Sequence, residues 1–89
     1  MASILIQHTV KDYAEWKKVF DSALDLRKSS GELSAQVYRD ASDPNKITTI
    51  NNWNSMANAQ NFAHSPELKA AMDKAGVVGV PAVYFLNEA

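Results

Sequence analysis

Residues 3–10 read SILIQHTV and residues 12–16 read DYAEW, and these two stretches decide the fold. The first is apolar and β-branched, which is typical of a strand. The second predicts the start of a helix, because Asp12 can accept hydrogen bonds from the first helical amides while Glu15 reaches back to the Asp12 N–H as a capping box. The chain is therefore expected to begin with a strand that is followed at once by a helix.

The helix that begins at Asp12 carries an apolar stripe and is expected to run to Gly31, a residue suited to a helix C-cap. The stripe residues fall three or four positions apart: Tyr13, Trp16, Phe20, Ala23, Leu24 and Arg27. Alternating or β-branched runs predict three further strands, and turn formers at 40–46 place a hairpin between the first two. The expected strands are Leu33–Arg39, Ile47–Trp53 and Ala82–Leu86.

A second helical segment is expected between the third and fourth strands. Ser55 is placed to cap its first part, and Ser65 with Pro66 has the pattern of a restart, with Ser65 as N-cap and Pro66 at the first helical position. Gly76 ends this segment. Pro81 is expected at the start of the last strand, where its missing amide donor is tolerated.

The predicted order is strand, helix, strand, strand, helix, strand. Right-handed crossovers favour the split βαβ arrangement, with the first and third strands at the centre. The sequence therefore predicts an α+β domain of the ferredoxin-like βαββαβ type. It has a four-stranded antiparallel sheet with its helices on one face, formed as a single domain by residues 1–89.

Neither face of the predicted sheet is polar. A solvated antiparallel face would show alternation of polar and apolar residues along each strand. Both alternating sets are apolar instead: Leu5, Ile50, Tyr84 and Leu86 on one, and Ile4, Ile6, Ile47, Val83 and Phe85 on the other. Helices can cover only one face, so the second is expected to meet another copy of the chain, which predicts a homodimer.

The charge balance of the chain excludes several classes of partner. Its 9 basic and 10 acidic residues are interspersed and give a formal net charge of −1. No basic patch indicates nucleic acid binding, and no cationic amphipathic or bilayer-length apolar segment indicates a membrane. The first residues lack the basic region and the long apolar run of a signal peptide. We therefore expect a cytoplasmic protein with neither nucleic acid nor a membrane as partner.

The sequence resembles the dimeric α/β-barrel superfamily, and within it the small proteins similar to antibiotic biosynthesis monooxygenases. Besides the opening strand and helix start, the similar motifs are Asp43-Pro44-Asn45, Trp53-Asn54-Ser55, Ser65-Pro66-Glu67-Leu68 and PAVYFL at 81–86. The resemblance implies a dimer whose two sheets face each other as a barrel, and a cleft between sheet and helices in each subunit. It implies that some relatives oxidise quinone-forming aromatic substrates without a metal or flavin, while others degrade haem or only bind ligands.

Haem degradation is not expected for this chain. The haem-degrading relatives use an asparagine on the first strand, a tryptophan on the second helix and a histidine further along that helix. The corresponding positions here hold Gln7 or His8, Phe62 and Met72. The usual metal-ligand spacings are absent as well, since His8 and His64 lie far apart in the sequence. The sequence therefore predicts no cofactor and no metal site.

His8 is the leading candidate for a catalytic residue, followed by Asn51 and Asn52. An imidazole at the end of a central strand can act as a general base or donate to a substrate oxygen. The alternative is a hydrogen-bonded histidine at a sheet edge or dimer interface. Asparagine is depleted in strands, and one of the two amides must point toward the helices, where a ligand could be its partner. Otherwise the strand ends or bulges there, with both amides satisfied locally.

Three aromatic residues, Tyr13, Trp16 and Trp53, are candidates for the walls of a ligand pocket. Their spacing along helix and strand is also what a hydrophobic core needs, so core packing is the alternative role.

Two functions from different classes remain open. The first is a cofactor-independent monooxygenase or cyclase acting on a small aromatic or polyketide-type molecule. In it His8 is the base or donor, an asparagine orients a carbonyl, and Trp16 and Trp53 stack on the ring. The second is a non-catalytic dimeric domain that binds a small ligand or only assembles. A cleft that joins His8, an asparagine and a tryptophan favours the first, and a solidly packed layer favours the second.

Overall fold

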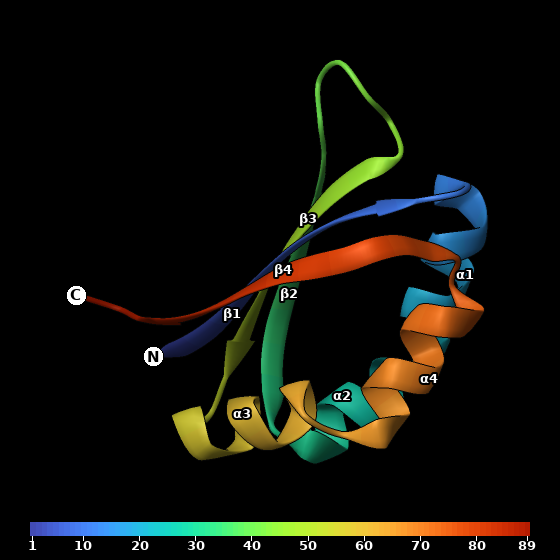
Figure 1. Ribbon diagram of the computed structural model, residues 1–89. Coiled ribbons are helices and arrows are strands. Elements are labelled where there is room, and N and C mark those ends of the chain that lie inside the picture. The colour runs from blue at the N-terminus through green and yellow to red at the C-terminus, as the bar shows by residue number, and fades with distance from the viewer.

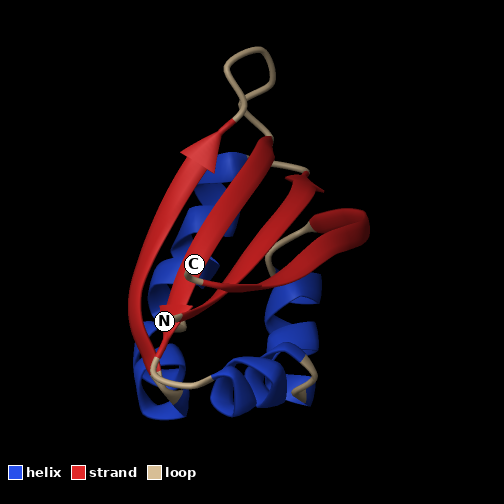
Figure 2. Cartoon of the chain, turned by 90° about the vertical axis from the view of Figure 1, so that its left-hand side faces the viewer, coloured by secondary structure: helices blue, strands red, loops and turns tan.

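The structure, a computed structural model, describes residues 1–89. Its elements are β1 (Ala2–Val10), α1 (Tyr13–Ser22), α2 (Leu24–Ser30), β2 (Glu32–Arg39), β3 (Lys46–Trp53), α3 (Met56–Ala63), α4 (Pro66–Lys74) and β4 (Val77–Asn87). The strands form one antiparallel sheet in the order β2-β3-β1-β4, and the helices lie together on one face of it (Figure 1, Figure 2). The ferredoxin-like α+β fold is thus confirmed, with the first and third strands at the centre. None of the helices has the length and apolar character that crossing a membrane requires.

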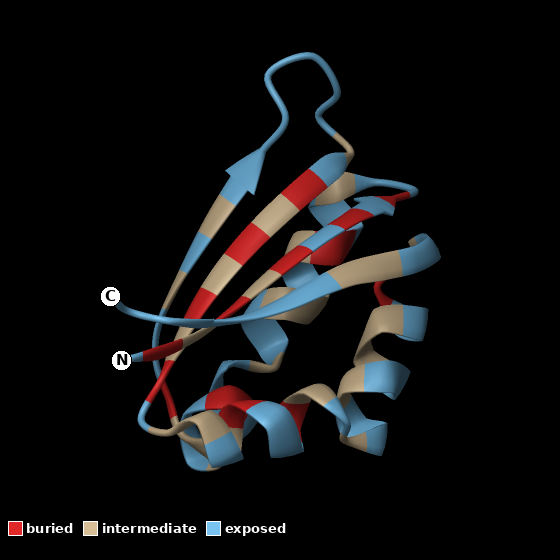
Figure 3. Ribbon diagram, turned by 60° about the vertical axis from the view of Figure 1, so that its left-hand side comes forward, coloured by how far each residue is buried: buried red, intermediate tan, exposed pale blue.

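Burial alternates along β1 and β3 (Figure 3), because successive side chains of a strand point to opposite faces. Ile4 and Ile6 on β1 and Ile47 on β3 are buried, and they face the helices. Leu5 pairs with Ile50 on one side and with Tyr84 on the other, so these residues share the opposite face. Helices cover the inner face only, and the outer face, which carries these apolar side chains among polar ones, is left open.

The buried core is divided into two clusters, which lie toward opposite ends of the central strands. Trp53 and Phe62 are the large aromatic residues of the first cluster, and Trp16 and Ile47 belong to the second. Small domains usually have one contiguous core. The division leaves the middle of the layer between sheet and helices to other residues.

The single helix expected over 12–31 is wrong, because the structure has two helices that meet at Ala23. In a continuous α-helix the Phe20 carbonyl would accept the amide four residues on. Here it accepts the amide of Ala23 at 3.3 Å and also Nη1 of Arg27, whose guanidinium lies over the Phe20 ring. The buried guanidinium of Arg27 is therefore a hydrogen-bond donor to a helical carbonyl at the point where the helix breaks.

The expected helix starts are confirmed, with one difference. Asp12 accepts the amide of Glu15 at 3.3 Å. The Glu15 carboxylate lies 3.3 Å from the Lys18 ammonium and makes no bond to the Asp12 amide, so only half of the capping box forms. Ser55 and Ser65 each accept the amide three residues on, as N-caps do.

The strand expected at 82–86 is longer and begins at Val77. Its pairing with β1 shifts opposite His8, where residues 79–81 form a bulge. Proline is tolerated on edge strands and at bulges, so Pro81 lies inside β4 and not at its start. The bulge thus falls directly beside the leading candidate for a catalytic residue.

Gly31 offers a test of how the end of α2 is built. Its φ is +117°, and an added Cβ would lie 2.6 Å from Oδ1 of Asn54. We expect Gly31→Ala to lower the free energy of unfolding by about 2 kcal/mol, because backbone strain adds to the clash. The matched control is Gly79→Ala, where φ is +74° and nothing lies within 4 Å, with an expected loss of about 1 kcal/mol. Equal losses in urea unfolding would show that the Asn54 contact has no consequence.

Candidate functional site

A cavity of about 70 Å³ lies between the sheet and the helices, in the space that the two core clusters leave. Its walls come from β1, β3 and all four helices, and most of them are apolar. Its polar lining is contributed by His8, Arg27, Thr49, Asn51 and the indole of Trp53. An apolar pocket with a few converging polar groups is the usual form of a small-molecule site.

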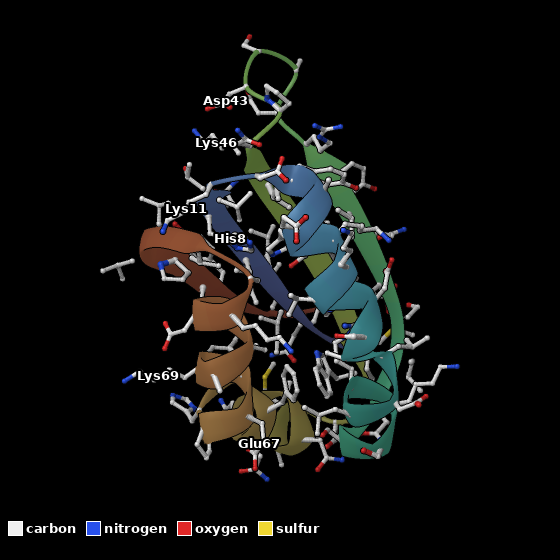
Figure 4. The ribbon with its side chains drawn as sticks, turned by 90° about the vertical axis from the view of Figure 1, so that its right-hand side faces the viewer. His8, Lys11, Asp43, Lys46, Glu67 and Lys69 are labelled. Atoms are coloured by element: carbon white, nitrogen blue, oxygen red, sulfur yellow. The ribbon has the colours of Figure 1, made fainter.

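His8 lies on β1 between α1 and α4, as Figure 4 shows, whereas Glu67 and Lys69 on α4 point away into solvent. Its side chain is turned toward the helices, and the ring centre lies 5.6 Å from that of Trp16. Only 8% of the residue is exposed, and neither ring nitrogen has a hydrogen-bond partner within the protein. Burial lowers the pKa of His8 below its usual value of 6.5, because desolvation penalises the imidazolium. The ring is therefore neutral at neutral pH, with one nitrogen free to accept a proton.

The structure separates the two asparagines. Asn51 faces the helices, is 5% exposed, and donates from Nδ2 to Oε2 of Glu32 at 2.8 Å, while its Oδ1 has no partner within the protein. Asn52 lies on the opposite face of the sheet, where Oδ1 accepts from Ser3 Oγ at 2.7 Å and Nδ2 donates to Ser34 Oγ at 2.9 Å. Asn51 thus joins His8 at the cavity, and Asn52 is satisfied far from it.

Two of the three aromatic candidates line the cavity. Trp53 is 1% exposed, packs against Phe62 at 5.0 Å between ring centres, and has an Nε1 with no acceptor. Trp16 stacks on Phe20 at 4.9 Å. Tyr13 is not part of the lining, and its ring lies under the Arg39 guanidinium at 3.9 Å. Trp53 was expected to stack on a ligand, and its unpaired N–H gives it a donor as well.

One residue of the polar lining, Arg27, belongs to a buried ion pair that sequence reasoning missed. Arg27 Nε lies 3.1 Å from Oε1 of Glu32, with 6% and 3% of the two side chains exposed. The signal in the sequence was Arg27 itself, a charged residue on the apolar stripe of its helix. A cation at such a position calls for a buried anion, but nothing local identifies Glu32 as that anion.

These groups define what the cavity can do chemically. Besides Arg27 and Thr49, its polar lining residues are Asn51 with an unpartnered acceptor, Trp53 with an unpartnered donor, and His8 with a neutral imidazole that can do either. A buried polar atom left unpaired costs about 1–3 kcal/mol, so a ligand that satisfies these atoms is favoured. The arrangement suits a flat aromatic molecule with oxygen substituents at its edge, from which His8 can take a proton.

The sequence matches the antibiotic biosynthesis monooxygenase family over residues 3–74. No curated protein matches it. Solved structures with this fold include one from Bordetella bronchiseptica assigned to the antibiotic biosynthesis monooxygenases, at 15% identity and a TM-score of 0.82 over 99% of this chain and 96% of the other. Another, from Caulobacter crescentus and assigned to the same group, has 20% identity and a TM-score of 0.78 over 99% and 89%. SnoaB, a cofactor-independent oxygenase from Streptomyces nogalater, has 14% identity and a TM-score of 0.74 over 99% and 94%.

The lowered pKa of His8 predicts how stability depends on pH. Below about pH 6.5 the unfolded chain binds a proton at His8 that the folded chain does not. The contribution of His8 to the free energy of unfolding should therefore be complete above that pH, and it should decline as the pH falls toward the folded-state pKa. We expect His8→Phe to remove this decline in urea unfolding, and His64→Phe, at the exposed end of α3, to keep it. An identical pH profile for wild type and His8→Phe would contradict the buried neutral imidazole.

Proposed function

The chain belongs to the antibiotic biosynthesis monooxygenase family, and from this premise we propose that it is a cofactor-independent oxygenase of a small, electron-rich phenolic compound. One observation carries the proposal. Three side chains that are more than nine-tenths buried, His8, Asn51 and Trp53, line one cavity, and each has a polar atom without a hydrogen-bond partner in the protein. A packed core would have no use for such atoms, since buried polar groups are nearly always hydrogen-bonded.

Each of the three side chains has a role in this proposal. His8 is the general base that removes the phenolic proton. Asn51 accepts a hydrogen bond from a substrate hydroxyl, because Oδ1 is the end of its amide that lacks a partner. Trp53 donates from Nε1 to a substrate oxygen on which negative charge develops. Asn51 therefore orients a hydroxyl of the substrate, and Trp53 binds the carbonyl oxygen of the substrate.

The reaction balances without a further co-reactant. A phenol with a hydrogen para to its hydroxyl reacts with O₂ to give a quinone and one water. The phenolate formed by proton transfer to His8 is electron-rich enough to pass an electron directly to O₂. One oxygen atom ends on the ring carbon, and the other leaves as water with the ring hydrogen and the proton that His8 returns. Four electrons pass from the organic molecule to O₂ in total.

A substrate needs more room than the cavity provides as it stands. Ligand sites usually measure about 300–1,000 Å³. A groove of about 300 Å³ runs between β4 and α4, and Ile6, Leu68 and Met72 line both it and the 70 Å³ cavity. Met72 is half-buried and unbranched, so a rotamer change can join the two spaces. We place the substrate entrance there, next to the bulge at 79–81.

The outer face of the sheet supports a homodimer. Leu5 and Ile50 at its centre are half-buried, and Tyr38, Tyr84 and Leu86 are 53%, 53% and 42% exposed. Exposed apolar side chains that gather on one face of a sheet mark a surface for interaction with another protein. A second copy presents the same face about a twofold axis, which would enclose both faces in a barrel.

Oxygen uptake with 1-naphthol, which has a hydrogen para to its hydroxyl, tests the catalytic proposal. We expect His8→Gln, which keeps hydrogen-bonding groups but loses the base, to lower kcat by about 100-fold or more. The matched control is His64→Gln, at an exposed position, and it should keep the wild-type rate. A naphthol that binds without any oxygen consumption would favour the non-catalytic ligand-binding function. A full rate in His8→Gln would remove His8 from the mechanism.

Light scattering tests the dimer. We expect Leu86→Lys, on the outer face of the sheet, to convert a species of twice the chain mass into one of the chain mass, because a buried lysine would be unpaired. Leu24→Lys is the matched control, since Leu24 on α2 is 40% exposed against 42% for Leu86 and lies in the helix layer. A wild-type protein that runs as a single chain at micromolar concentration would contradict the covered face.

A further inference from the structure

The carboxylate of Glu32 is held firmly at the start of β2. One of its oxygens lies 3.1 Å from Arg27 Nε and the other accepts from Asn51 Nδ2 at 2.8 Å. Arg27 is fixed in turn, because its Nη1 donates to the Phe20 carbonyl and its guanidinium lies 3.8 Å from the centre of the Phe20 ring. Neither member of the ion pair is free to turn away from the cavity wall.

This ion pair determines the direction of the Asn51 amide. A carboxylate that forms an ion pair with a guanidinium can only accept hydrogen bonds. If the amide were reversed, its oxygen would face a Glu32 oxygen at hydrogen-bond distance with no proton between them. Nδ2 must therefore point to Glu32, and Oδ1 is left as the open end of Asn51.

We infer that Glu32, anchored by Arg27, is a positioning residue that fixes Asn51 as a hydrogen-bond acceptor and so makes the cavity select ligands that bring a donor to it. The inference rests on the proposed function in one respect, that Asn51 contacts the ligand. It adds that the preference for hydroxyl-bearing molecules over carbonyl-bearing ones is set by a residue that does not touch the ligand.

Glu32→Gln reverses the polarity of the site in a defined way. The carbonyl oxygen of the substituted side chain can keep the bond from Arg27, which leaves its amino group facing Asn51. The Asn51 amide must then turn to offer Oδ1 to that group, and its own amino group becomes the open end. The cavity wall exchanges an acceptor for a donor with almost no change in volume.

The experiment compares the binding of two probes, phenol and acetophenone, by the shifts of indole N–H resonances. Phenol can donate and accept, whereas acetophenone can only accept. We expect the wild-type protein to bind phenol about tenfold more tightly, the factor of one buried hydrogen bond, and Glu32→Gln to abolish or reverse that preference. Because the same two probes are compared in each protein, differences in their size cancel.

Two variants control this comparison. Glu67→Gln, the same substitution on the exposed first turn of α4, should keep the phenol preference. Glu32→Asp, which keeps an acceptor-only carboxylate, should still bind phenol more tightly than acetophenone. A folded Glu32→Gln with the wild-type preference would overturn the inference, and so would a wild-type protein that binds neither probe. The probes are compared by binding alone, so a preference that shifts without any oxygen uptake would sustain the inference while the oxygenase proposal failed.

A second measurement keeps the inference testable if Glu32→Gln does not fold. In the wild-type protein the Asn51 amide protons should exchange with solvent far more slowly than those of Asn54, because one of them is held by a buried carboxylate. Exchange at the rate of Asn54 would overturn the positioning role.

Discussion

The buried ion pair between Arg27 and Glu32 is the interaction on which the middle of the molecule depends. It connects α1, α2, β2 and β3, because the guanidinium reaches back to the Phe20 carbonyl and the carboxylate reaches across to Asn51. Removing one partner from such a pair typically costs about 3–5 kcal/mol, since the other charge is left uncompensated. A hydrophobic pair could fill the same space, but it could not end a helix and orient an amide at once.

The division of the core follows from these polar groups. Apolar side chains cluster toward the two ends of the central strands, and His8 and Asn51 lie between the clusters on the inner face. Arg27, Glu32 and Asn51 Nδ2 find hydrogen-bond partners inside the protein. The nitrogens of His8, Nε1 of Trp53 and Oδ1 of Asn51 do not. A rigid wall that carries open polar groups is the condition for a preorganised site.

The sequence predicts those parts of the structure that local chemistry determines. The first strand, the N-caps at Ser55 and Ser65 and the order of elements were expected from patterns within a few residues, and the structure confirms them. Non-local contacts decided the rest. The break at Ala23 is tied to a guanidinium bond from the following helix, and the early start of β4 depends on a bulge against β1.

The candidate site shows the same limit. The sequence offered His8 and the asparagine pair as candidates, but only strand register decides that Asn51 and not Asn52 faces the helices. The unpaired N–H of Trp53 was not foreseen either, because an indole N–H is normally paired when it is buried.

The indole N–H resonance of Trp53 reports directly on whether the unpartnered polar groups around the cavity receive a ligand. The chain has 2 tryptophans, so a ¹⁵N-labelled sample gives two indole N–H resonances. Trp16→Phe removes one of them and so assigns the resonance of Trp53, and His8→Gln serves as the control variant. We expect titration with 1-naphthol to move the Trp53 N–H resonance downfield as it gains an acceptor. If both indole resonances stay in place at saturating 1-naphthol, the cavity is closed to such ligands and does not serve as a binding site.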